Sequence, residues 1–312
     1  MSDAATLLAE TPARALLGRF MRHRLALFSA GVLVALAALA LLAPVIETLI
    51  GVDAEAVDLF ARYGPASAAH PLGTDELGRD VLVRLLYGGR ISLFVGLTAT
   101  IAAAIIGTAV GLAAGYAGGR IDAFVMRVTD GVIALPVLPL LIVLAAVDLG
   151  KLGLSEDLLN SENVSLYRIV AIVALVGWTT VARLVRASTL SLKSRPFVLA
   201  AHAQGAGAFR IMARHILPNL ASPIIVATTL SVGNVILLES VLSFLGLGIQ
   251  PPLPSWGNLL TGAQETIWEA PGLAFYPGML IFVTVIAFNF VGDGLQDALD
   301  PRARDRKTAD RL

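Results

Sequence analysis

The stretch "LALFSAGVLVALAALALLAPVI", residues 25–46, decides what kind of fold this chain can form. It contains no charged residue and only one hydroxyl group, that of Ser29. A helix needs about 20 apolar residues to cross the hydrocarbon core of a bilayer, and this run is long enough. The basic residues before it, Arg22 and Arg24 among them, would also suit a signal peptide, but a cleaved apolar core is usually only about 7 to 15 residues long. We therefore interpret residues 25–46 as an uncleaved membrane span.

Further apolar runs of similar length follow along the chain. The whole sequence of 312 residues is 56% hydrophobic and 15% charged, with a mean hydropathy of +0.79, which is high for a water-soluble protein. We predict an all-α, polytopic membrane protein with six transmembrane helices. After the first span, the predicted spans are residues 91–116, 121–147, 166–185, 220–247 and 274–291.

The positions of the basic residues predict which loops face the cytoplasm. Lys and Arg are concentrated before the first span, between the fourth and fifth spans, and after the last span. Positively charged loops are retained in the cytoplasm, so both termini are expected there. The predicted organisation is a cytoplasmic N-terminal segment (1–24), the first transmembrane helix (25–46), an external loop with an amphipathic helix (47–90), a five-helix core (91–297) with a cytoplasmic loop (186–218), and a cytoplasmic tail (298–312).

A charged cluster, "HPLGTDELGRD" at residues 70–80, stands out before the second span. Thr74 is a good N-cap, and the two acidic residues after it would lie in the first turn of a helix, where the helix dipole favours them. This pattern predicts an amphipathic helix at the outer membrane surface. A metal or catalytic site is the alternative, but the alternating oxygen ligands of an ion loop are missing. The predicted ion pairs, at a spacing of four residues, are Asp75–Arg79 and Asp80–Arg84.

The loop "SRPFVLAAHAQGAGAFRIMARHILPN", residues 194–219, predicts two short helices around a glycine turn. Pro196 suits a first helical turn, Gly205 and Gly207 break the helix, and a second helix resumes before Pro218. One interpretation is an exposed hairpin, with Phe209, Met212 and Ile216 on one face, that inserts into a groove on a cytoplasmic partner. The other is a basic loop that lies on the membrane surface, and composition alone does not separate them.

Several charged residues fall inside the predicted spans. Arg127 and Asp130 are three residues apart and are expected to neutralise each other. Glu239 is harder to explain, because a lone carboxylate at membrane depth is expensive and normally faces protein or water. It either lines the translocation path or a gate, or has a buried hydrogen-bond partner. The candidate path or gate residues are Asp130, Glu239 and Ser243.

Glycine and proline predict further features of the bundle. Gly107, Gly111 and Gly115 recur every four residues in the second span, a spacing that lets helix backbones approach closely. Pro136 and Pro139 interrupt the third span and predict a kink. Residues 246–271 are rich in proline and contain no basic residue, which predicts a stiff external loop. Trp256 in this loop is expected near the membrane interface.

The sequence limits the kinds of activity that the chain can have. It has no cysteine, which excludes disulfides, thiolate metal sites and thiol nucleophiles. No phosphate-binding loop is present, since its single Gly-Lys pair, Gly150-Lys151, has Ala145 where the first glycine is required. All four histidines fall in loops or termini, which disfavours an intramembrane enzyme. The two remaining classes are a transport subunit powered by a partner and a self-sufficient secondary transporter.

Two sets of motifs resemble those of a known family. The 194–219 loop is similar to the coupling motif of ABC-importer permeases, with departures at Leu199, where the motif has Glu, and at His215, where it has Ile. Four segments resemble the peptide and nickel ABC-importer permeases, in particular the C-type subunit of dipeptide and oligopeptide systems. These are "HPLGTDELGRDVLVRLLYGGRISL" (70–93), "RHILPN" (214–219), "ESVLSFLGLGIQPPLPSWGNLL" (239–260) and "GDGLQDALDPR" (292–302). The coupling loop implied by this resemblance comprises Ala200, Ala201, Gly205, Ala206, Gly207, Arg210, Leu217 and Pro218.

The resemblance implies a type I importer permease in the bacterial cytoplasmic (inner) membrane, which imports di- or oligopeptides. It implies a second permease of similar fold, two ATP-binding subunits or domains that hold ATP and Mg, and an external solute-binding protein. This chain would bind no cofactor or metal and would not be an enzyme. Nickel or another chelated solute is the alternative cargo, although a chain with no cysteine makes a poor lining for a soft metal ion. Basic and acidic residues balance at 23 each, so nothing indicates binding of nucleic acid.

Overall fold

The computed structural model describes residues 17–152, 155, 161 and 163–299, and over these residues the chain forms helices and no β-strand. This confirms the predicted all-α class. The predicted tails fall largely in residues 1–16 and 300–312, which lie outside the described residues. The elements are α2 (Arg24–Leu41), α3 (Ala43–Ile50), η1 (Leu59–Ala61), α4 (Val81–Ala117), α5 (Gly119–Ala134), α6 (Val137–Ala145), η2 (Leu149–Leu152), α8 (Val164–Lys193), α9 (Pro196–Ala203), α10 (Ala208–Ile211), the π-helical turn η3 (Met212–Ile216), α11 (Leu217–Phe244), η4 (Asn258–Leu260), α12 (Ala263–Thr266) and α13 (Gly272–Leu299).

Five helical segments of the described chain are long and apolar enough to cross a membrane, and the bent pair α5–α6 makes a sixth if it counts as one span. The five are α2, α4, α8, α13 and the continuous segment Ala208–Phe244. The third predicted span is therefore a broken one, with an angle of 88° between α5 and α6. The cause is Pro136, because a proline pushes the residue before it out of the helical region, and Leu135 is extended, with ψ of 138°.

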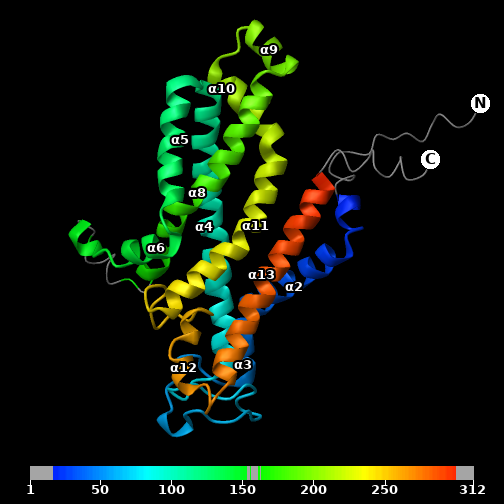
Figure 1. Cartoon of the computed structure of the whole chain (residues 1–312). Coiled ribbons are helices and arrows are strands. Elements are labelled where there is room, and N and C mark those ends of the chain that lie inside the picture. Colours follow the sequence, from blue (N-terminus) through cyan, green and yellow to red (C-terminus); the bar gives the residue numbers. More distant parts are fainter. Residues whose placement is uncertain (1–16, 153–154, 156–160, 162, 300–312) are drawn as a thin grey trace, which may run out of the picture.

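The helices define two ends of the molecule (Figure 1). At one end, which we call the hairpin end, α9 and α10 project beyond the bundle. At the other, the loop end, the connections that precede α4 and α13 lie together. The start of α2 lies beside the end of α13, because Arg19 Nη1 donates to the carbonyl oxygen of Ala298 at 3.2 Å and His23 Nε2 lies 3.7 Å from Asp297 Oδ2. The helix α2 thus packs along α13 at the edge of the bundle, and most of its side chains are exposed (Figure 1).

The closest helix pair is α4 with α8, and the glycines of α4 allow this contact. A Cβ atom placed on Gly107 would lie 2.4 Å from the carbonyl oxygen of Trp178, and one on Gly111 would lie 2.4 Å from that of Ala182. Atoms cannot approach so closely, so only glycine fits at these positions. The packing role predicted for the four-residue spacing is confirmed.

The predicted start of the helix that enters the second span is wrong. Thr74 lies in an isolated β-bridge with Asp80, and α4 begins only at Val81. Asp80 is the N-cap, since its Oδ1 accepts from the amide of Val83 at 2.8 Å. The expected helix in residues 74–80 is replaced by a turn, because the Asp75 Oδ1 accepts from the amides of Leu77 and Arg79, both at 2.9 Å.

The ion pairs of this turn are partly those predicted. Arg79 Nε donates to Asp75 Oδ2 at 2.8 Å, as expected. Arg84 instead contacts Asp75, at 3.4 Å between Nε and Oδ2, while Asp80 pairs with His70 at 3.0 Å between Oδ2 and Nδ1. These carboxylates are occupied by amides and basic side chains. In the described part of the chain, no group of three or more His, Asp or Glu is placed to hold a metal ion.

Candidate coupling and translocation sites

The hairpin between α8 and α11 folds as two short helices around a glycine turn, as the sequence predicts. Gly205 has φ of +80°, in the left-handed region that glycine adopts at little cost. The turn closes with two hydrogen bonds, from the amide of Gly205 to His202 and from that of Ala206 to Ala201. The second helix, α10, passes through the π-helical turn η3 directly into α11.

One side of this hairpin is packed firmly against the bundle. Val198, Ala201, Ile211 and Ile216 are buried and form a hydrophobic cluster. The partners in that cluster include Val181 and Val185 of α8 and Leu220 of α11. The hairpin is therefore attached to two membrane-spanning helices through a continuous apolar contact.

The other side of the hairpin exposes large apolar side chains. We call Phe197, Leu199, Ala200 and Phe209 the tip patch, since all four are exposed and Phe209 is 81% exposed. The prediction that Phe209, Met212 and Ile216 share one exposed face is wrong, because Ile216 is buried. The π-helical turn between them holds an extra residue, which rotates the following side chains away from the face of α10. Exposed apolar patches of this kind mark sites of contact with a protein or with a membrane.

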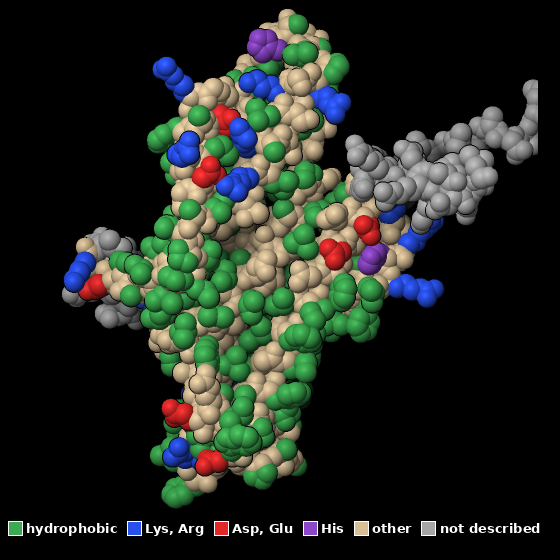
Figure 2. Space-filling model, viewed as in Figure 1, with side chains coloured by type: hydrophobic (Ala, Val, Ile, Leu, Met, Phe, Trp, Pro, Cys, Tyr) green, Lys and Arg blue, Asp and Glu red, His purple; other side chains and the backbone are tan. Residues whose placement is uncertain are grey.

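The residues implied as a coupling loop lie mostly on the hairpin, and Leu217 and Pro218 lie at the start of α11. Ala201 is buried, Ala206 and Leu217 are half-buried, and the exposed members are Ala200, Gly205, Gly207, Arg210 and Pro218. Lys and Arg side chains gather toward this end on the face shown in Figure 2. The hairpin end is thus both basic and locally apolar.

Asp130 on α5 lies at the surface and is bound to α8 rather than to its own helix. It forms an ion pair with Arg183, so the expected pair with Arg127 is wrong. A second pair joins the same two helices, in which Arg186 donates from Nε and Nη2 to the two oxygens of Asp122 at 2.7 and 2.6 Å. The alignment of α5 along α8 explains the choice of partner, because it offers each aspartate an arginine from the neighbouring helix.

A cavity of about 350 Å³ lies between α4, α5, α6, α8 and α11. Its wall is mainly apolar, but Asn234 of α11 is exposed there in the middle of a membrane-spanning helix. An amide at this depth faces protein or water rather than lipid. Sequence reasoning missed Asn234, although it is a lone amide within an apolar run. The other polar side chains of the lining are Thr100, Thr179, Thr180 and Ser231.

Glu239 and Ser243 are buried in a different place, where they join three parts of the chain. Ser243 Oγ donates to Glu239 Oε1 at 2.7 Å, and Ser92 Oγ of α4 donates to Glu239 Oε2 at 3.2 Å. Each serine in turn accepts from residues 246–271, the predicted external loop, which we call the outer loop. Ser243 Oγ accepts from the amide of Ile249 at 3.0 Å, and Ser92 Oγ accepts from that of Trp256 at 3.1 Å. The carboxylate therefore holds α4, α11 and the outer loop together, which agrees with the alternative of a buried hydrogen-bond partner.

This geometry predicts different effects for two substitutions of Glu239. Glu239→Gln keeps a carbonyl acceptor and is expected to retain most of the transport rate. Glu239→Ala leaves two buried hydroxyl groups without an acceptor and is expected to cost about 1–3 kcal/mol of unfolding free energy for each group left unsatisfied. Solute uptake in proteoliposomes measures the effect of Glu239→Gln. Chemical unfolding in mixed micelles, followed by circular dichroism, measures the loss of stability in Glu239→Ala. Complete loss of uptake in Glu239→Gln with normal stability would show that the charge itself serves transport.

Trp256 in the outer loop is only 2% exposed, so its ring is packed inside the protein and does not face the surrounding lipid or water. Its Nε1 donates to the carbonyl oxygen of Leu85 at 3.0 Å. The indole lies against Gly89, where a Cβ would come within 2.9 Å of the ring. The outer loop is thus anchored to α4 of its own chain, because two adjacent glycines, Gly88 and Gly89, leave room for the ring.

The long apolar helices, the hairpin and the mainly apolar cavity that contains Asn234 define a polytopic helical membrane protein. The chain belongs to the family described as "Binding-protein-dependent transport system inner membrane component", whose profile matches residues 107–305. The profile described as "N-terminal TM domain of oligopeptide transport permease C" matches residues 11–55. The second match supports the interpretation of residues 25–46 as a membrane span.

Curated relatives cover most of the chain. The "Oligopeptide transport system permease protein OppC" of Escherichia coli (strain K12) is 41% identical over 286 residues, which is 92% of this chain and 90% of that protein. The protein of the same description from Bacillus subtilis (strain 168) is 37% identical over 286 residues, 92% of this chain and 88% of that protein. The "Dipeptide transport system permease protein DppC" of Bacillus subtilis (strain 168) is 42% identical over 245 residues, 77% of this chain and 71% of that protein.

Proposed function

We propose that this chain is a permease subunit of an ATP-driven importer of di- or oligopeptides. The observation that carries the proposal is the similarity, over 92% of the chain, to permeases described as oligopeptide transport proteins. The chain works with a second permease of similar fold, two ATP-binding subunits and an external solute-binding protein. The family's dependence on a binding protein favours this assembly over a self-sufficient secondary transporter.

The hairpin supplies the contact with an ATP-binding subunit. Its tip patch is apolar and exposed, which suits burial in a groove on a protein partner. Its opposite side is packed on α8 and α11, so movement of the ATP-binding subunits is passed to these helices. ATP and Mg are bound by those subunits. This assignment places the hairpin end, and with it both termini, in the cytoplasm, in agreement with its positive charge.

The translocation path runs beside the cavity that contains Asn234. Asp130 lies on α5, one of the helices that form this cavity, and is half exposed, so it is available to the path once its pair with Arg183 opens. Glu239 and Ser243 contribute indirectly, because they hold the outer loop at the loop end. The loop end faces the outside and receives the solute-binding protein.

Co-purification from the native host tests this proposal. The tagged chain, extracted in a mild detergent at natural abundance, is expected to bring with it a second permease and one or two ATP-binding proteins, identified by mass spectrometry. The recovered complex, placed in liposomes with its binding protein, is expected to take up labelled peptide only when ATP is supplied. Recovery of the chain alone, with uptake that needs no ATP, would contradict the proposal.

A further inference from the structure

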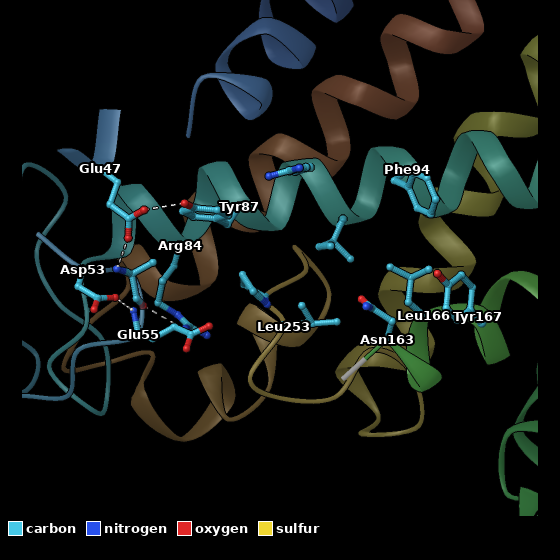
Figure 3. A pocket seen from close by; sticks show the side chains of 14 residues that line it. Glu47, Asp53, Glu55, Arg84, Tyr87, Phe94, Asn163, Leu166, Tyr167 and Leu253 are labelled. Carbon is cyan, nitrogen blue, oxygen red and sulfur yellow. Dashed lines mark hydrogen bonds between the residues drawn. The ribbon is translucent and has the colours of Figure 1, made fainter. Parts of the chain in front are cut away.

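A cavity of about 520 Å³ at the loop end lies outside the sites described above. It is formed by α3 and the residues that follow, the first turns of α4, the start of α8, and the outer loop. Figure 3 shows that the two ends of its lining differ in character. The charged side chains Glu47, Asp53, Glu55 and Arg84 gather at one end, and the uncharged, mainly apolar end holds Phe94, Leu166, Tyr167 and the amide of Asn163.

Arg84 is the first sign that this cavity accepts an anionic group. Its side chain is only 7% exposed, yet its contacts with the protein are long. Nη1 lies 3.5 Å from the carbonyl oxygen of Ala54, and Nε lies 3.4 Å from Asp75 Oδ2 without forming a hydrogen bond. Buried donors are normally matched at about 2.7–3.2 Å. A guanidinium with five N–H donors therefore lines the cavity with most of its hydrogen-bonding capacity unused.

The other charged groups make the same end zwitterionic. Glu47 is already bound, since it accepts from Tyr87 Oη at 2.6 Å and from the amide of Ala54 at 2.7 Å. Arg90 is exposed and lines the cavity, and within the described residues its side chain forms no hydrogen bond or ion pair. The Glu55 side chain also lines the cavity, and it too forms no hydrogen bond or ion pair with the described residues. Asp53 Oδ1 already accepts from the amide of Glu55 at 2.8 Å. The other oxygen of Asp53, the Glu55 carboxylate and the two arginines are thus available to a ligand that carries both signs of charge.

The cavity also lies at the depth of lipid headgroups. A helix of 37 residues such as α4 is about 55 Å long, whereas the hydrocarbon core is about 30 Å thick. Arg90 is the last charged residue of α4, and the remainder of this helix is uncharged. From the apolar end of the cavity, exposed side chains continue along the same face of α4 at Phe94, Ile101 and Ile105. An apolar chain can therefore lie along α4 below the charged end.

We propose that this cavity binds a zwitterionic phospholipid of the outer leaflet whose headgroup carries a primary ammonium, as in phosphatidylethanolamine. Arg84 and Arg90 bind the phosphate, and Asp53 and Glu55 accept hydrogen bonds from the ammonium. The acyl chain follows Phe94 and the exposed stripe below it. The bound lipid joins α3, α4 and α8, and therefore stabilises the loop end.

The distribution of charge favours a lipid over a transported peptide. An extended peptide carries its ammonium and its carboxylate at opposite ends. The cavity instead brings both signs together at one end, while the other end is uncharged and mainly apolar. A headgroup with a tail attached fits this arrangement, and a peptide does not.

Binding of defined phospholipids to the purified full chain tests this proposal. The chain, freed of lipid in a mild detergent, is titrated with phosphatidylethanolamine, phosphatidylcholine and phosphatidylglycerol, and binding is followed by native mass spectrometry and thermal unfolding. Phosphatidylethanolamine is expected to bind with about tenfold lower Kd than phosphatidylcholine, because a trimethylammonium group donates no hydrogen bond to the carboxylates. Phosphatidylglycerol, which has no ammonium, is expected to bind as weakly as phosphatidylcholine.

Two surface variants provide the matched comparison. Arg90→Gln is expected to weaken binding of phosphatidylethanolamine about tenfold without changing the unfolding temperature of the lipid-free chain. Arg62→Gln removes an exposed arginine of the same end that does not line the cavity. It is expected to change neither the binding of phosphatidylethanolamine nor the unfolding temperature. The proposal would be overturned if the three lipids bound equally, or if the two variants had equal effects. A titration with dialanine tests the peptide alternative, and the proposal would be overturned if dialanine bound to the chain but not to Arg90→Gln. It would also be overturned if the complex with partner subunits had no preference among the three lipids.

Discussion

Phe209→Asp is expected to lower ATP-driven uptake by about tenfold or more while leaving the fold of the chain intact. The ring is 81% exposed, so its removal opens no cavity and the new carboxylate stays in water in the isolated chain. In the complex, the same carboxylate would be buried against an ATP-binding subunit. Loss of one central aromatic side chain from an interface typically costs about 2 kcal/mol or more, and burial of an unpaired charge adds to this. Peptide uptake in proteoliposomes, together with recovery of ATP-binding subunits by affinity purification, measures the effect.

Phe209→Leu is the matched control, because it keeps an apolar side chain and is expected to retain most of the uptake. Gly205→Glu also places a charge on the hairpin, and it too is expected to uncouple uptake from ATP hydrolysis or to prevent assembly. It is the less direct test, since Gly205 has φ of +80° and any side chain strains the turn. Normal uptake in Phe209→Asp would show that the tip patch does not contact the ATP-binding subunit.

The sequence predicted the helices that depend on local composition. The apolar runs became α2, α4, α8, α11 and α13 because a long, largely apolar segment in a bilayer must satisfy its backbone within one helix. The glycine turn of the hairpin was also predicted, since φ of +80° at Gly205 is a property of a single residue. The spacing of Gly107, Gly111 and Gly115 indicated a close helix contact, although it did not name α8 as the partner.

The failed predictions have two kinds of cause. Asp130 pairs with Arg183 of another helix, 53 positions along the chain, whereas the sequence offered Arg127 one turn away. The N-cap of α4 is Asp80 rather than Thr74 for a local reason, because Asp75 accepts hydrogen bonds from the amides of a turn. The break between α5 and α6 is also local, since it lies at Pro136, but the sequence did not give its angle of 88°. A distant partner thus decided the ion pair, and local backbone geometry decided the other two features.

The external loop shows the same limit at a single residue. Its proline content suggested stiffness, and Trp256 suggested a membrane interface, where tryptophan is common. The ring is instead inserted between the outer loop and α4, where Gly88 and Gly89 leave space for it. The adjacent glycines in the sequence indicated a close contact at this point of α4, but the residue that fills the space, Trp256, lies more than 160 residues away.

Trp256→Ala is expected to destabilise the chain by about 3–5 kcal/mol, the usual cost of removing a large aromatic side chain from a well-packed interior. The substitution leaves a cavity against α4 and removes the donor to the carbonyl oxygen of Leu85. It also frees the loop segment whose amide binds Ser92, so the network around Glu239 is weakened from one side. Chemical unfolding in mixed micelles, followed by the helical circular dichroism signal, measures the loss.

Trp268→Ala is the matched control, because Trp268 lies in the same external region and is 93% exposed. Its removal is expected to change the unfolding free energy by no more than about 0.5 kcal/mol. Trp256→Phe keeps an aromatic ring but loses the indole donor. Its loss of unfolding free energy is expected to lie between those of Trp256→Ala and Trp268→Ala. Equal losses for Trp256→Ala and Trp268→Ala would contradict the anchoring role. The expected order instead implies that the outer loop is a fixed part of the permease, so the solute-binding protein that we propose at this end would meet a preformed surface.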